Sequence, residues 1–242
     1  MAENSDLSIY RGKDIIITDH IKIHQPTIGQ IEEYGEREYF SLVSTFILTP
    51  FDMIAQLDQQ GIDFTQITDF ALFMGLLPCI PKERSQILFG NTDFTEYRQV
   101  ATENGVVLMN RESVISEPVY HILAKYMRKI HCIAPPKYDK VGNEATKQKL
   151  IEFAYEDLKY ASRKPYKSQL QNLVSALVNH PYFKCNYYDV WDMPVFAFYD
   201  SLQRVGIISN VMNLYQGIYS GNVDYSKINK KELDWTRQLG KN

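Results

Sequence analysis

The stretch SEPVYHILAKYMRKI, residues 116–130, carries the most regular pattern in the chain. Its apolar positions, which recur at alternating steps of three and one, are Val119, Ile122, Leu123, Tyr126, Met127 and Ile130. Because an α-helix turns once in about 3.6 residues, this spacing places all of them on one face. Ser116 stands just before the pattern, where a helix N-cap is favoured. The stretch therefore predicts an amphipathic helix packed on a core.

Helical patterns continue on both sides of this stretch. Toward the C-terminus they cover residues 144–164, 168–178 and 195–215, and toward the N-terminus residues 27–47, 49–61 and 65–78. Thr49 and Pro50 form a start signal for the second of these N-terminal helices, and Gly61 suits its end. The stretches are typical of a protein built mainly from amphipathic helices.

Two short regions have the alternating pattern of β-strands instead. Residues 15–24 are rich in β-branched side chains, and Ile21 and Ile23 alternate with polar residues, which predicts a strand or a short hairpin. Residues 95–109 contain two β-rich runs separated by Asn104 and Gly105, a good signal for a hairpin turn. The predicted fold class is therefore mainly α, a multi-helix bundle-like domain with a small β element near residues 15–24 and 95–109.

The best linker candidate is APPKYDKVGN, residues 134–143, which is rich in proline and polar residues. It predicts an N-terminal α+β part over residues 1–133 and a C-terminal helical part over residues 144–242. One continuous domain is the alternative.

Composition excludes several classes of function. The 242 residues contain 26 basic and 29 acidic side chains, so no dense positive charge for nucleic acid is expected. The longest apolar runs, such as residues 70–77, are too short to span a bilayer, and we expect a soluble protein without a membrane partner. Three cysteines without CxxC spacing, Cys79, Cys132 and Cys185, favour reduced, buried thiols over a disulfide framework.

No pattern predicts a catalytic, cofactor or metal site. His20 and His24 lie on one expected strand, and no further ligand follows at a suitable spacing. His121 and His131 are too far apart along one helix to share an ion, which favours a surface role for His121 and a dipole partner for His131. Neither a GxSxG nucleophile motif nor a phosphate-binding GK[ST] motif is present. We therefore expect no enzyme activity, no catalytic residues, no metal and no cofactor.

The stretch VWDMPVFAFYDSLQRV, residues 190–205, gathers large apolar side chains around Pro194. Asp192 is predicted to cap the following helix, and Asp200 to pair with Arg204 one turn later. Two interpretations remain open for the apolar residues: core packing, or capture of a partner by exposed aromatic side chains. The residues proposed for the second interpretation are Trp191, Phe196, Phe198, Tyr199 and Leu202.

This stretch, with GIYSGNVDYSKINKKELDW at residues 217–235, resembles the end of small tail proteins from tailed bacteriophages of Gram-positive hosts. The stretch IKIHQPTIGQIEEYGEREYF, residues 21–40, resembles the start of such proteins. Among them are tail assembly chaperones. The resemblance implies a helical protein without enzymatic activity that binds the phage tape-measure protein, or other tail proteins, in the host cytoplasm during tail morphogenesis.

A structural component of the virion, in the tail, baseplate or neck, is the alternative. Self-association into a homo-oligomer is a further expectation.

Overall fold

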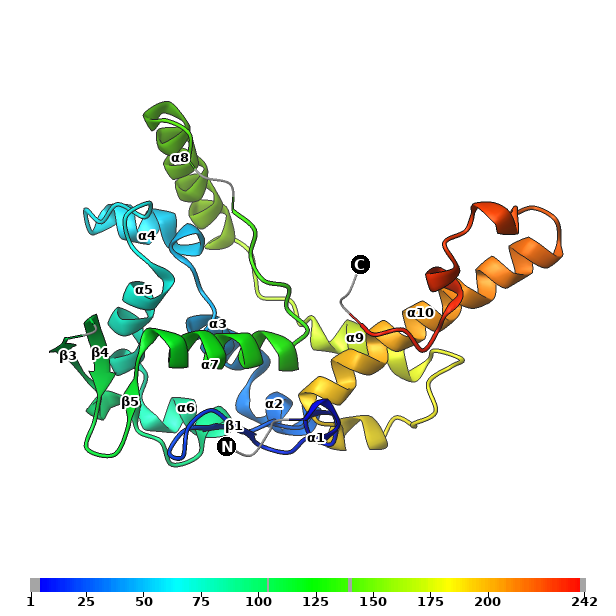
Figure 1. The fold of residues 1–242 in the computed structure, drawn as a ribbon, viewed down its shortest axis with the longest axis horizontal. Coiled ribbons are helices and arrows are strands. Elements are labelled where there is room, and N and C mark those ends of the chain that lie inside the picture. Colours follow the sequence, from blue (N-terminus) through cyan, green and yellow to red (C-terminus); the bar gives the residue numbers. More distant parts are fainter. Residues whose placement is uncertain (1–4, 104, 139–140, 240–242) are drawn as a thin grey trace.

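The computed structural model describes residues 5–103, 105–138 and 141–239, and it confirms a mainly α fold (Figure 1). The α-helices of the described residues are α1 (Asp6–Tyr10), α2 (Ile28–Tyr34), α3 (Glu36–Thr45), α4 (Ile54–Gln59), α5 (Asp69–Leu76), α6 (Lys82–Phe89), α7 (Glu117–Ile130), α8 (Glu144–Ala161), α9 (Leu170–Val178) and α10 (Val195–Tyr219). The 3-10 turns are η1 (Pro50–Met53), η2 (Leu77–Cys79), η3 (Phe94–Glu96), η4 (Asp189–Asp192), η5 (Tyr225–Lys227) and η6 (Lys230–Leu233).

Both predicted β regions form antiparallel pairs. Strand β1 (Ile15–Ile16) pairs with β2 (Lys22–Ile23), and β3 (Arg98–Thr102) pairs with β4 (Gly105–Met109). Gly105 has a φ of 113°, which explains the glycine at this turn. Its predicted turn partner Asn104 lies outside the described residues. A fifth strand, β5 (Val114–Ile115), extends the second sheet beyond the sequence prediction.

Helix α7 crosses the centre of the body and buries an apolar face, as predicted, but this face is turned slightly from the expected one. Leu123, Met127 and Ile130 are fully buried, whereas Ile122 is 43 % exposed. Tyr120 is buried in its place, because its ring packs against that of Phe73 with 4.6 Å between centroids. The aromatic neighbours from α5 therefore decide which side of α7 faces inward.

The predicted helix start at Thr49 and Pro50 is confirmed. The backbone N–H and the hydroxyl of Thr49 both donate to the Asp52 carboxylate, at 2.8 and 2.7 Å. The chain first makes the 3-10 turn η1 and then continues as α4, and Gly61 follows with a φ of 69°. Ser116 occupies the N-cap position of α7, although its side chain makes no capping hydrogen bond.

Two helices project from the body, α8 and the second half of α10 (Figure 1). Helix α8 packs on α4 through Leu150, Ile151 and Ala154, which cover a small separate apolar cluster. Helix α9 instead contributes Leu170, Val174 and Leu177 to the main core, together with residues from the N-terminal part. The division into residues 1–133 and 144–242 stays a prediction, and residues 139 and 140 of the linker lie outside the described residues. Among the described residues, no helix is both long and apolar enough to span a bilayer.

Candidate protein-binding surfaces

The base of α10 is held to the body by backbone contacts. The N–H of Val195 donates to the carbonyl of Pro26 at 2.9 Å, and that of Ile28 donates to the carbonyl of Met193 at 3.0 Å. Pro194 forms an isolated bridge with Thr27. Asp192 does not cap the helix, contrary to the prediction: Pro194 is the N-cap residue, and the Pro26 carbonyl takes the first N–H. The backbone of a distant segment thus replaces the expected side-chain cap.

The five proposed partner-binding residues lie in different environments. Phe198 is fully buried in the main core and offers no surface to a partner in this structure. Phe196 is partly buried and makes an edge-to-face contact with Tyr10, with 6.4 Å between centroids. Tyr199 and Leu202 are partly buried against the core, and burial raises the pKa of Tyr199 to about 12. Trp191, which is also partly buried, is the member of the set that lines a groove.

This groove, called the Trp191 groove below, lies between α2, α9 and the segment around η4 and has a volume of about 460 Å³. Its apolar lining consists of Ile28, Leu170, Val174, Val178, Tyr187 and Trp191. The rings of Tyr187 and Trp191 meet edge to face, with 5.8 Å between centroids. Tyr187 is 55 % exposed, so this wall presents aromatic surface to solvent.

Two glutamates give one side of the Trp191 groove negative charge. Glu36 accepts the N–H of Gln169 at 2.7 Å and that of Leu170 at 3.0 Å, and so caps the start of α9. Burial raises the pKa of Glu36, but hydrogen bonds from Ser168 and from these two backbone groups outweigh it, and the pKa is lowered overall. Glu36 is therefore a carboxylate at neutral pH. Glu32, in the preceding helix α2, lines the groove and is exposed.

The outer part of α10 has an unusual composition for a helix that leaves the body. Residues 205–219 contain no Asp, Glu, Lys or Arg. Met212, Tyr215 and Tyr219 share one side by their spacing of three and four, and they are 46 %, 36 % and 85 % exposed. The two tyrosine rings stack with 6.2 Å between centroids. We call these three residues the arm face.

After α10 the chain folds back along the helix (Figure 1). The guanidinium of Arg204 donates to the backbone carbonyl of Trp235 at 2.6 Å and to that of Arg237 at 3.0 Å. The predicted surface pair of Arg204 with Asp200 is thus replaced by an anchor for the returning segment. Burial raises the pKa of Asp200, and Arg204 opposes part of that rise.

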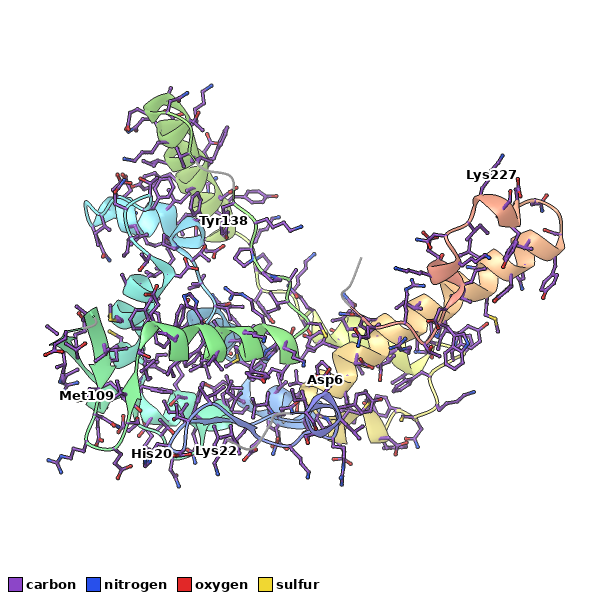
Figure 2. All side chains as sticks on the ribbon, viewed as in Figure 1. Asp6, His20, Lys22, Met109, Tyr138 and Lys227 are labelled. Atoms are coloured by element: carbon purple, nitrogen blue, oxygen red, sulfur yellow. The ribbon has the colours of Figure 1, made fainter. Side chains whose placement is uncertain are left out.

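The tip of this returning segment is basic. Residues 225–231, YSKINKK, contain three lysines and no acid, and we call them the Lys segment. Lys227, Lys230 and Lys231 are all exposed, and Lys227 lies at the far end of the projection from the body (Figure 2). Tyr225 is 50 % exposed beside them. A charge-free apolar face and a basic segment therefore both lie on the projecting part of the molecule.

The histidines do not assemble a chemical site. His121 is exposed, as expected, and its Nε2 lies 3.7 Å from the Glu117 carboxylate. The interpretation of His131 as a charged partner of the helix dipole is wrong, because the side chain is buried and burial lowers its pKa to about 4. His24 pairs with Asp14 at 2.8 Å. Within the part of the chain that the structure describes, no three His, Cys, Asp or Glu residues are grouped to hold a metal ion.

Sequence patterns identified Trp191 but not the groove beside it. Its lining comes from residues 28–36 and from residues 168–191, which are far apart in the chain. Residues 32–38 hold four acids, but no sequence pattern connects them with Trp191.

Comparison with protein families finds a match for the C-terminal third of the chain. Residues 162–240 match a family model described as the YomV second domain. This range contains α9, η4, α10 and the Lys segment. No curated protein and no solved structure matches the chain significantly. YomV is a protein of a Bacillus phage, so the C-terminal third of this chain is similar to a domain of a phage protein.

Proposed function

We propose that this chain is a non-enzymatic tail assembly chaperone of a bacteriophage, which binds the tape-measure protein in the host cytoplasm during tail morphogenesis. The observation that carries the proposal is the arm face on α10. A projecting helix exposes Met212, Tyr215 and Tyr219 and has no charged residue between positions 205 and 219. The similarity of residues 162–240 to a phage protein domain supports the phage setting.

The chemistry of the arm face suits an apolar helical client. An amphipathic client helix docks by its apolar face, and charged side chains within the contact would cost desolvation energy. The arm face has none. Methionine adapts its shape to different neighbours, and tyrosine buries a large ring while its hydroxyl stays hydrated. A surface of this kind can hold a long repetitive client at successive positions.

The proposal is tested by co-expressing the chain with the tape-measure protein of the same phage and measuring how much client co-purifies. We expect the double variant Tyr215→Ser, Tyr219→Ser to lose at least about tenfold in recovered client, because it removes two aromatic anchors. Tyr160→Ser is the matched control, since Tyr160 is 60 % exposed on the other projecting helix, α8. Equal recovery with all three proteins contradicts the proposal.

A second measurement separates a chaperone from a virion component. Mass spectrometry of purified particles should find the chain absent or far below the copy number of the tail proteins. Stoichiometric presence in finished particles would instead favour the structural role in the tail, baseplate or neck.

A further inference from the structure

We propose that copies of this chain bind one another head to tail, with the Lys segment of one copy in the Trp191 groove of the next. Both surfaces belong to this chain, they lie at different places on it, and they carry opposite charge. The proposal does not use the arm face, so its failure would leave the proposed client binding untouched.

The first argument is charge complementarity. Glu32 and Glu36 line the groove, and residues 32–38 together hold four acids and one arginine. The Lys segment presents three exposed lysines without an acid among its residues. Asp224 and Glu232 flank the segment, and within the described residues Lys227 makes one loose ion pair, with Asp224 at 3.8 Å. Complementary patches of this kind steer association and select the partner.

The second argument is the shape and chemistry of the groove. Its volume of about 460 Å³ lies within the range of about 300–1,000 Å³ that is typical of binding pockets. The lining is mostly apolar, with Tyr187 and Trp191 at one wall. Tyr225 is half exposed within the Lys segment and supplies an aromatic ring of the type that anchors interfaces. We assign Tyr225 to the groove and the lysines to its acidic side.

The third argument excludes a contact within one chain. Helix α10 has 25 residues, so it is about 37 Å long, and it leads away from the groove toward the Lys segment. The hydrogen bonds of Val195 and Met193 fix its base to residues 26–28. The chain returns along α10 after the helix ends, and the hydrogen bonds of Arg204 to the carbonyls of Trp235 and Arg237 hold it there, so the Lys segment stays beside α10 and does not enter the groove of its own chain. A contact between two different surfaces is heterologous and extends into a ring or an open chain of copies.

The first experiment measures molar mass by light scattering at chain concentrations from about 1 µM to 1 mM, which covers weak to moderate affinities. We expect the mass to rise with concentration and the rise to shrink in about 1 M salt, where charges are screened within about 3 Å. A monomer at every concentration overturns the proposal.

Charge-reversal variants test the surfaces themselves. Glu32→Lys and the pair Lys230→Glu, Lys231→Glu should each raise the apparent dissociation constant about tenfold or more. Combining all three changes in one chain lets the reversed position 32 pair with the reversed positions 230 and 231, while Glu36 and Lys227 keep their charges, so association should recover in part. Glu152→Lys and Lys159→Glu, at exposed positions of α8, are the matched controls. Reversals without effect, or a triple variant weaker than either parent, overturn the proposal.

A mixing experiment separates this arrangement from a symmetric dimer. Ser175→Trp fills the exposed side of the groove, and a second variant changes Lys227, Lys230 and Lys231 to serine. Each variant alone should stay monomeric, whereas their mixture should form a complex of two chains and no larger species. A mixture that remains monomeric contradicts head-to-tail contact.

Discussion

The hydroxyl of Tyr39 lies 2.7 Å from Nε2 of His131, and both side chains are buried in the main core. The other ring nitrogen, Nδ1, lies 2.7 Å from the carbonyl of Met127, which only accepts. Nδ1 therefore carries the proton, and Tyr39 donates to Nε2. This arrangement satisfies a neutral imidazole, whereas a second proton on Nε2 would deprive the Tyr39 hydroxyl of its acceptor.

The first prediction concerns pH. Burial lowers the pKa of His131 to about 4, and the bond to Met127 opposes only part of this effect. The unfolded chain takes up the proton near a pKa of about 6.5. Stability is therefore complete above about pH 6.5 and is lost as the pH falls toward 4, by about 3 kcal/mol from this residue.

Urea unfolding at pH 7, 6, 5 and 4.5 measures this loss. A His131→Gln variant should be less stable at pH 7 but should depend less on pH over the same range. Equal slopes for the two proteins would show that His131 is not the titrating group.

The second prediction concerns the thiols. Burial raises the pKa of Cys132 to about 11, and the charge of Asp200 adds to the rise. Cys79 and Cys185 are exposed, so the expectation that the thiols are buried is wrong for these two. Because the thiolate is the reactive form, iodoacetamide at pH 8 should modify Cys132 about 100-fold more slowly than a free thiol of pKa ~8.5. Peptide mass spectrometry over time measures the order in which the three cysteines are labelled, with urea-unfolded protein as the reference. Labelling of Cys132 as early as that of Cys79 and Cys185 would refute the prediction.

The third prediction separates core from surface on α10. Phe198→Ala removes a ring that is fully buried and should lower the free energy of unfolding by about 3–5 kcal/mol. Tyr219→Ser changes a residue that is 85 % exposed and should alter it by less than about 0.5 kcal/mol. Thermal unfolding of both variants provides the comparison. A large loss for Tyr219→Ser would mean that the outer part of α10 is packed more closely than the structure shows.

The fourth prediction concerns the contact of Gly12 with the base of α10. Gly12 has a φ of 73°, and an added Cβ would lie 2.5 Å from Cγ of Pro194. Gly61 has a similar φ of 69° with nothing within 4 Å of such a Cβ, which makes it a matched control. Gly61→Ala should cost only the backbone term of about 1–2 kcal/mol, and Gly12→Ala clearly more. Equal losses in urea unfolding would exclude the steric contribution.

Local signals in the sequence predicted much of the fold. Thr49 and Asp52 lie three residues apart, and the hairpin ends at Thr102 and Gly105 are neighbours in the chain, so short-range chemistry defines them. The orientation of α7 could not be predicted because it depends on the ring of Phe73, which lies in another helix. The start of α10 could not be predicted for the same reason, since the N–H of Val195 donates to the carbonyl of the distant Pro26.

The candidate surfaces show the same limit. Trp191 was recognisable as a large aromatic residue in an apolar stretch, but its partners across the groove, Ile28 and Leu170, come from two distant segments. The sequence pattern also did not distinguish Phe198, which the core covers, from Tyr219, which projects into solvent. Both are large rings on one helix. Their roles differ because Phe198 lies where the helix is packed in the body, whereas Tyr219 lies where it projects beyond the body.

The attachment of α10 at one end makes it a lever. Its first half is packed in the body, from Pro194 to Val205, and residues 206–219 extend beyond it as a rod. Over a length of about 20 Å, a rotation of about 10° in the body displaces the tip by about 4 Å. Small changes in packing at Pro194 are thereby amplified into large changes in the reach of the tip.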